Sequence, residues 1–250
     1  MSNVFNKKNI ISLVKSYNQQ YNDTISIYQT KESLIQSLKE KMKSQCKHPI
    51  CLERILQPEK IKAGRPANWD KNPVEWLTNI DIDNVLETYE DHFPHYKHIG
   101  TYSVDYDTKD VFGKCLADNV CHLNIQSCKN KKYKKISIVF NLSKHYEPGS
   151  HWVALIIDVS NNEICYYNSG ATPPPKRIYT LMKNIKKTMP QGDKTALRWN
   201  TLQHQKSTTE CGMFVIHTII QMIERKFDSV IHDRMLDDTF VFRLRDILFQ

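Results

Sequence analysis

Hydrophobic residues recur at helical spacing in two sets within the first 45 residues. Thr30 is the expected N-cap of the second helix. Prolines and glycine then cluster between residues 47 and 69, which is typical of a loosely structured join. We therefore expect a helical arm domain over residues 1–66 and a separate core over residues 67–250. The two sets are Ile10, Leu13, Val14, Tyr17 and Tyr21, and Leu34, Ile35, Leu38 and Met42.

The pattern changes from residue 69 onward, where short alternating or apolar runs follow helical segments. Residues 102–106, 136–142, 151–159, 163–168 and 195–202 have the composition of strands, and residues 160–162 form a hairpin-like turn between two of them. Strands mixed with helices at both ends predict an α+β domain with a mixed central sheet. The predicted helices of this domain cover residues 80–90, 178–188, 211–225 and 241–248.

The composition is that of a globular protein, with 40% hydrophobic and 25% charged residues. No apolar run reaches the roughly 18 residues of a membrane-spanning helix, so we expect no membrane insertion. The first 20 residues lack the apolar centre of a signal peptide, which predicts that the protein stays on the cytosolic side. Seven cysteines in such a chain favour reduced thiols over a disulfide framework.

Positive charge is concentrated in the arm. Residues 1–68 hold 12 Lys and Arg against 5 Asp and Glu, whereas the rest holds 23 against 22. A solvated helical face explains such a balance, and so does contact with an acidic partner or a nucleic acid. No nucleic-acid module is recognisable, so such binding would be mostly to phosphates and sensitive to salt.

Cys211 begins the apolar helical segment after the polar loop 204–210. The thiolate is the reactive form of cysteine, and the positive end of a helix dipole lowers the thiol pKa. Gly212 leaves room for a substrate carbonyl to approach the backbone, as an oxyanion hole requires. Cys211 is therefore the candidate nucleophile, although many cysteines at this position in a helix are simply packed thiols.

His151 opens a predicted strand after a turn and is the candidate general base. Asn168 ends the next strand, where its side-chain carbonyl can accept from the imidazole and fix its tautomer. Asn168 also fits a purely structural role in the turn with Ser169 and Gly170. Asp158 lies roughly 23 Å from His151 along an extended strand, at about 3.3 Å per residue, which excludes it as the direct partner.

These residues carry a family resemblance. The sequences His151-Trp152-Val153 and Tyr166-Tyr167-Asn168-Ser169, followed by Gln205 and then Cys211-Gly212, resemble the Ulp1-like cysteine proteases, which include SUMO proteases and the adenovirus maturation protease. The order His, Asn, Cys matches that family. The resemblance implies a papain-like fold, a role for Gln205 as oxyanion donor, and a role for Trp152 in lining a narrow substrate channel.

Asn168 departs from the aspartate that is usual in cellular SUMO proteases. It resembles the large-DNA-virus branch represented by the African swine fever virus polyprotein protease, which also has a helical N-terminal arm. This resemblance implies cleavage of structural polyproteins after Gly-Gly during virion maturation, in the host cytoplasm (viral factory) and in the virion. It implies neither a metal nor an organic cofactor.

Three other functions remain open on the residues alone. A deSUMOylase or deubiquitinase would act on a modifier that ends in Gly-Gly. An acyltransferase similar to YopJ uses His and Cys in the same order, but has glutamate at the position of Asn168. A non-catalytic binding module would place the function in the arm.

The remaining candidates have simpler explanations. Asn141, at the end of a strand, could position substrate but is more typical of a strand terminus. The polar run Lys129–Lys135 indicates a solvated loop. His204 and His217 receive no role. A zinc site is disfavoured because the spacing of its candidate ligands lacks the usual paired cysteines; these candidates are Cys115, Cys121, His122 and Cys128.

Overall fold

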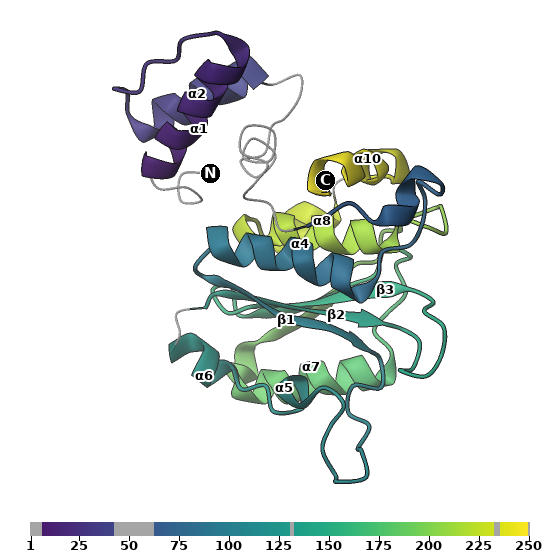
Figure 1. Cartoon of the computed structure of the whole chain (residues 1–250). Coiled ribbons are helices and arrows are strands. Elements are labelled where there is room, and N and C mark those ends of the chain that lie inside the picture. The colour runs from purple at the N-terminus through teal and green to yellow at the C-terminus, as the bar shows by residue number, and fades with distance from the viewer. Residues whose placement is uncertain (1–6, 43–62, 131–132, 233–235, 250) are drawn as a thin grey trace. The chain divides into compact units, whose positions relative to one another are not determined.

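The computed structural model describes residues 7–42, 63–130, 133–232 and 236–249 (Figure 1). Tertiary contacts divide the chain into two compact units, Met1–Arg65 with Asp246–Gln250 and Pro66–Arg245. The central part of the expected join, residues 47–62, lies outside the described residues. The assignment of residues 1–66 and 67–250 to separate domains stays a prediction.

Two helices form the described part of the arm, α1 (Lys7–Tyr21) and α2 (Lys31–Met42), and they pack against each other. The predicted apolar positions are buried or partly buried, except Tyr21, which is 41% exposed. The hydroxyl of Thr30 accepts from the backbone N–H of Ser33 at 3.2 Å, which confirms the predicted N-cap.

A mixed sheet of five strands forms the centre of the second unit, in the order β1-β2-β3-β4-β5. The pairs β1–β2 and β4–β5 are parallel, and the pairs β2–β3 and β3–β4 are antiparallel. The predicted α+β class with a mixed sheet is confirmed. The strands are β1 (Tyr96–Ser103), β2 (Lys135–Asn141), β3 (Trp152–Asp158), β4 (Glu163–Tyr167) and β5 (Ala196–Trp199).

Helices cover both faces of this sheet (Figure 1). Helices α4 (Asn79–His92) and α8 (Cys211–Glu224) lie on one face, and α5 (Asp118–Cys121), α6 (Ile125–Asn130) and α7 (Lys176–Thr188) on the other. Every residue of β2 and β3 is consequently buried. The shorter helices are η2 (Ala67–Asp70), η3 (Gly192–Lys194), α9 (Phe227–Ile231), α10 (Asp238–Arg243) and α11 (Arg245–Leu248).

Helix length bears on the membrane prediction. Of the helices in the described part of the chain, none combines the length and the apolarity that crossing a membrane requires.

Strand β1 begins six residues earlier than the predicted strand 102–106, and that prediction was wrong for its second half. The inward positions include polar His98 and Thr101, so alternation of apolar residues does not reveal them. Both side chains bond to Asp83 of α4, His98 Nε2 at 2.8 Å and Thr101 Oγ1 at 2.6 Å. These hydrogen bonds offset the free-energy cost of burying the two polar side chains.

Two other predicted elements are also altered. The strand predicted over residues 195–202 is confined to β5, and the helix predicted over 241–248 is divided between α10 and α11. Asp237 caps α10 by accepting from the backbone N–H of Phe240 at 2.8 Å. Because of this cap, α10 begins at Asp238, three residues before the start of the predicted helix.

Lys135 corrects the expectation of a solvated loop over residues 129–135, of which 131–132 lie outside the described residues. It begins β2 and is buried against Asp158 of β3, whose carboxylate accepts from its ammonium group. Asp158 also accepts from Ser160 Oγ at 2.7 Å and from the backbone of Asn161 at 3.0 Å. Asp158 is the last residue of β3, whereas His151 lies just before the first one, so Asp158 is not a direct partner of His151.

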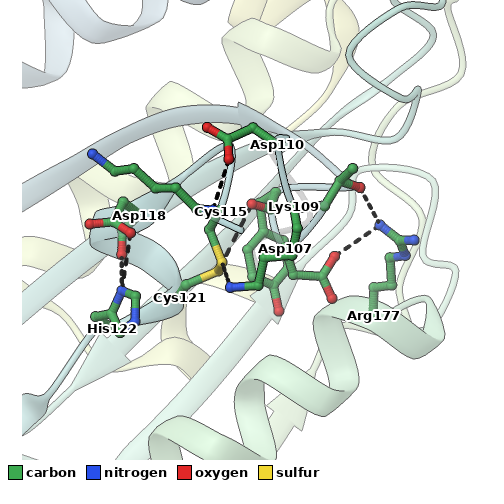
Figure 2. The surroundings of a disulfide bond; sticks show 11 residues. Asp107, Lys109, Asp110, Cys115, Asp118, Cys121, His122 and Arg177 are labelled. Carbon is green, nitrogen blue, oxygen red and sulfur yellow. Dashed lines mark hydrogen bonds and ion pairs between the residues drawn. A yellow bond between two sulfur atoms is a disulfide. The ribbon is translucent and has the colours of Figure 1, made fainter. Parts of the chain in front are cut away.

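Cys115 and Cys121 form a disulfide, which corrects the expectation of reduced thiols (Figure 2). The bond closes the segment that leads into α5, and Asp110 stabilises the turn of this segment by accepting from the backbone N–H of Lys114 at 2.8 Å. Two of the four residues weighed as zinc ligands are therefore oxidised in this structure. No cluster of three or more potential ligands occurs among the described residues.

Candidate active site

The loop after β2 leads to His151, which lies just before β3, the central strand of the sheet. Asn141, the last residue of β2, holds both ends of this loop: its side-chain oxygen accepts from the backbone N–H of Ser143 at 3.0 Å and of Ser150 at 3.1 Å. The side chain is 8% exposed. Asn141 therefore fixes the segment that precedes His151, and its predicted contact with substrate stays a prediction.

His151 and Asn168 meet across the β3–β4 hairpin. His151 lies one residue before β3 and Asn168 one residue after β4, and these two strands are antiparallel neighbours. The imidazole Nε2 lies 2.8 Å from Asn168 Oδ1. The structure thus brings together two residues that are 17 positions apart in the sequence, as expected from the hairpin.

The orientation of the Asn168 amide is set by its neighbours. Its Nδ2 donates to the hydroxyl of Thr172, and to the hydroxyl of Tyr166 at 3.4 Å. Burial raises the pKa of Tyr166 to about 12, so this hydroxyl is neutral. With Nδ2 so engaged, Oδ1 accepts from His151, which places the imidazole proton on Nε2 and leaves Nδ1 as the basic nitrogen.

Asn168 also stabilises the turn with Ser169 and Gly170, the structural role that was the alternative to orienting His151. Its Oδ1 accepts from the backbone N–H of Gly170 at 2.9 Å. Its backbone is paired on both sides with Asn200, through bonds of 2.9 Å and 2.7 Å. The turn and the bond to His151 therefore coexist, and each helps to hold the other.

Cys211 is the first residue of α8 and its side chain is 1% exposed. The backbone N–H groups of Trp152, Gly212 and Cys211 lower the pKa of this thiol. Because Trp152 directly follows His151 and lies beside Gly212, the start of β3 and the start of α8 are neighbours.

The pKa of the Cys211 thiol differs from the sequence-based expectation. Burial raises it, and the negative charge of Glu210 adds to this effect, while the three backbone N–H groups lower it. The helix N-terminus alone therefore does not ionise the sulfur. A base must remove the proton, which is the role foreseen for His151.

A side chain at Gly212 would crowd its neighbours, and the expectation that this glycine leaves space for substrate stays a prediction. A Cβ at this position would lie 3.1 Å from Leu77 Cδ1 and 3.3 Å from Trp152 Cδ1. Trp152 is 7% exposed, and its indole N–H donates to the carbonyl of Leu77 at 2.9 Å. These contacts fix the indole ring beside the start of α8, and its lining of a substrate channel stays a prediction.

Gln205 is buried and joined to the segment that carries Asn168. Its Oε1 accepts from the hydroxyl of Ser169 at 2.6 Å, and its Nε2 donates to the carbonyl of Ser207 at 2.9 Å. An amide nitrogen carries two hydrogens, so one N–H remains after the bond to Ser207. The side chain is thus held in one orientation before the loop reaches Cys211.

The other histidines have structural surroundings. His204 lies 3.0 Å from the hydroxyl of buried Tyr167, and the ring of His217 packs against Phe240 with centroids 5.2 Å apart. A cavity of about 470 Å³ lies elsewhere, between α5 and α7. It contains none of the predicted site residues, and the thiol at its wall belongs to the disulfide of Cys121.

Sequence reasoning missed the residues that hold the site together. Leu77, Thr172 and Asn200 are far from the motifs or are of types that occur in any turn, so no pattern points to them. Glu210 did give a signal, since an acidic residue directly before a nucleophilic cysteine opposes its ionisation unless a cation compensates it. That cation is Arg245, whose guanidinium contacts both carboxylate oxygens of Glu210.

A buried thiol at a helix start and a histidine bonded to an amide are groups that a cysteine protease uses. The model of the Ulp1 protease family, C-terminal catalytic domain, matches residues 113–246. The chain belongs to this family and is a cysteine protease.

Relatives in large DNA viruses share more of the chain. The R355 protein of Acanthamoeba polyphaga mimivirus, which is named as a thiol protease, is 24% identical over 92% of this chain and 84% of its own length. The cysteine protease S273R of African swine fever virus is 24% identical over 72% of this chain and 70% of its own length. The predicted resemblance to this viral branch is confirmed.

Solved structures show the same fold. The crystal structure of the African swine fever virus pS273R protease has a TM-score of 0.63, with 19% identity, and covers 98% of this chain and 89% of that chain. The C-terminal Ulp1 protease domain, in complex with the yeast ortholog of SUMO, has a TM-score of 0.50 and 17% identity, covering 71% and 76%.

Proposed function

We propose that this protein is a viral endopeptidase that cleaves structural polyprotein precursors after Gly-Gly during virion maturation. It acts in the host cytoplasm, at the viral factory, and in the virion. Cys211 is the nucleophile, His151 the general base and Asn168 the residue that orients His151. The observation that carries the proposal is the 2.8 Å contact between His151 and Asn168 at the start of β3, the strand that packs against the helix begun by Cys211.

The first half of the reaction forms an acyl-enzyme. His151 Nδ1 takes the proton of the Cys211 thiol as the sulfur attacks the carbonyl carbon of the scissile bond. Negative charge then develops on the carbonyl oxygen, and the backbone N–H of Cys211 and the remaining N–H of Gln205 donate to it. When the C–N bond breaks, the imidazolium returns its proton to the leaving amine, and a thioester remains on Cys211.

Water completes the reaction. His151 removes a proton from a water molecule that attacks the thioester carbon, and the same donors stabilise the second tetrahedral intermediate. The C–S bond breaks, the thiolate regains its proton from the imidazolium, and the carboxylic acid product leaves. The chain's own residues thus account for every proton transfer.

A cleavage experiment tests this function. Wild type and Cys211→Ala are incubated with polyproteins from the same virus, and the new N-termini are sequenced. We expect cuts directly after Gly-Gly with wild type and none with Cys211→Ala. The matched control is Cys165→Ala, which removes another buried free thiol and keeps the cleavage. Cleavage by Cys211→Ala at the wild-type rate would contradict the assignment of the nucleophile.

A second candidate function is removal of a modifier that ends in Gly-Gly. It is favoured by the fold shared with the Ulp1 domain that was solved with a SUMO ortholog, and by relatives named SUMO-1 cysteine proteases. A fluorogenic SUMO conjugate and a fluorogenic Gly-Gly peptide, compared at equal concentration, separate the two functions. Faster cleavage of the conjugate, by orders of magnitude in kcat/KM, would favour the deSUMOylase.

The basic arm supports a further part of the proposal, a contact with an anionic partner. Lys7, Lys8 and Lys15 are exposed on α1, whereas Lys41 is paired with Asp23 at 2.6 Å. We assign this face to an acidic protein or a nucleic acid, by charge alone.

A further inference from the structure

A buried ion pair lies at the N-terminal end of α8. Glu210, the N-cap residue of that helix, receives Arg245 Nε on one carboxylate oxygen at 2.9 Å and Nη2 on the other at 3.1 Å. Both side chains are 3% exposed. Such a bidentate pair has a fixed geometry, because the planar guanidinium matches the two oxygens.

Arg245 is itself held from two further sides. Its Nη1 donates to the backbone carbonyl of Glu75 at 2.9 Å, and its guanidinium carbon lies 4.5 Å from the centre of the Trp69 ring. The cation therefore cannot turn toward solvent without losing three sets of contacts. Glu210 additionally accepts from the Thr209 hydroxyl at 3.1 Å.

The position of Glu210 is unfavourable for a nucleophile that must become an anion. Its carboxylate belongs to the residue before Cys211; burial is the main cause that raises the pKa of that thiol, and the negative charge of Glu210 adds to it. The loop before Glu210 also contains Lys206, and the carboxylate of Asp238 in α10 accepts from the backbone N–H groups of Lys206 and Ser207. Arg245 is the cation that contacts Glu210.

We propose that Arg245 is a positioning residue of the proteolytic reaction: by neutralising Glu210 it fixes the first turn of α8 and allows negative charge to develop on Cys211. The inference rests on the proposed role of Cys211 as nucleophile. It adds a residue 34 positions beyond the cysteine to the machinery of the site, and it gives the buried pair a chemical purpose in addition to a structural one.

The test measures the alkylation rate of Cys211 by iodoacetamide as a function of pH, by peptide mapping. Arg245→Met keeps an apolar chain against Trp69 but leaves Glu210 uncompensated. We expect its alkylation midpoint to move up by about one pH unit and kcat/KM near neutral pH to fall about tenfold, with KM little changed. The double variant Glu210→Gln, Arg245→Met removes both charges and should recover most of this loss.

The matched control is Arg198→Met, because Arg198 also pairs with two carboxylates and lies 5.9 Å from a phenylalanine ring. It should leave the Cys211 midpoint unchanged. If Arg245→Met does not fold, Arg245→Lys and the double variant carry the test. A merely structural role would lower thermal stability at an unchanged midpoint, which would overturn the proposal, as would a double variant no better than Arg245→Met.

Failure of this inference is distinguishable from failure of the proposed function. Alkylation reports on the thiol whether or not a peptide is cleaved, whereas the proposed function falls if Cys211→Ala retains cleavage. An unchanged midpoint in Arg245→Met, together with an inactive Cys211→Ala, would reject Arg245 and keep the protease.

Discussion

Asn168 is the residue on which the orientation of the base depends, because its amide is held by Thr172 and Tyr166 while its oxygen faces His151. Asn168→Ala should lower kcat/KM by about 10²-fold or more, since the imidazole loses the partner that sets its tautomer. Asn168→Asp keeps an oxygen acceptor and should stay within about tenfold of wild type.

Steady-state cleavage of the best substrate checks this prediction. Asn119→Ala, which removes an exposed asparagine of another segment, is the control and should match wild type. Wild-type activity in Asn168→Ala would show that the bond to His151 is only part of the turn.

Gly212 provides a second test at the residue scale. An added methyl group would press on Leu77 and Trp152, and overpacking of this kind costs about 1–3 kcal/mol. Gly212→Ala should therefore lower the free energy of unfolding by that amount and reduce activity, because Trp152 must move. Gly64→Ala is the control, since no atom lies within 4 Å of its added Cβ. Equal stability of the two variants in urea unfolding would contradict the packing account.

At the scale of elements, the pairing of β2 with β3 includes the buried ion pair of Lys135 and Asp158. Burial alone would raise the pKa of Asp158, but hydrogen bonds from Asn161 and Lys135 outweigh burial and hold the pKa below its usual range. A lowered pKa stabilises the fold above the unfolded value of about 3.9, and this stabilisation is lost as the pH falls through the folded-state pKa.

Asp158→Asn should consequently cost about 3–5 kcal/mol at neutral pH, because Lys135 remains buried without its counter-charge. The difference from wild type should shrink as the pH falls below the unfolded value of about 3.9, and it should be smallest once the pH has passed the lowered folded-state pKa of Asp158. Urea unfolding at a series of pH values measures both effects. A difference that stays constant down to pH 2 would show that the carboxylate charge contributes nothing.

Strands made of largely apolar runs were predicted from the sequence, and elements stabilised by polar contacts were not. Strands β2, β3 and β4 are rich in apolar residues and bounded by turns, so their positions were found to within a residue or two. Two inward positions of strand β1 are the polar residues His98 and Thr101, and both side chains bond to Asp83 of α4. A contact of that kind exists only in the folded chain.

For the molecule as a whole, the sequence indicated the three candidate residues but not the residues that hold them in place. His151 and Asn168 were paired correctly because an antiparallel hairpin determines which ends meet. The raised pKa of Cys211 and the disulfide of Cys115 and Cys121 were missed, since burial and the proximity of thiols depend on tertiary packing. The contact between His151 and Asn168 could thus be predicted, whereas the residues that hold these two side chains in place could not.

The uneven charge of the chain gives a prediction at this scale. Replacing Lys7, Lys8 and Lys15 with Gln should weaken binding to duplex DNA or poly-glutamate. On DNA, the plot of log binding constant against log salt concentration should become less steep by roughly 0.9 for each phosphate contact that is lost. Cleavage of a short neutral peptide should be unchanged. Absence of binding by wild type at low salt, to both polymers, would reject the anionic partner.

The proposed mechanism depends on ionisation of Cys211 by His151, and the alkylation rate of this thiol measures that ionisation. With iodoacetamide near pH 7, Cys211 in wild type should react about tenfold faster, or more, than in His151→Ala. Cys165, whose pKa burial raises well above the usual thiol value, should be unreactive in both proteins. Equal rates at Cys211 with and without the imidazole would contradict the account.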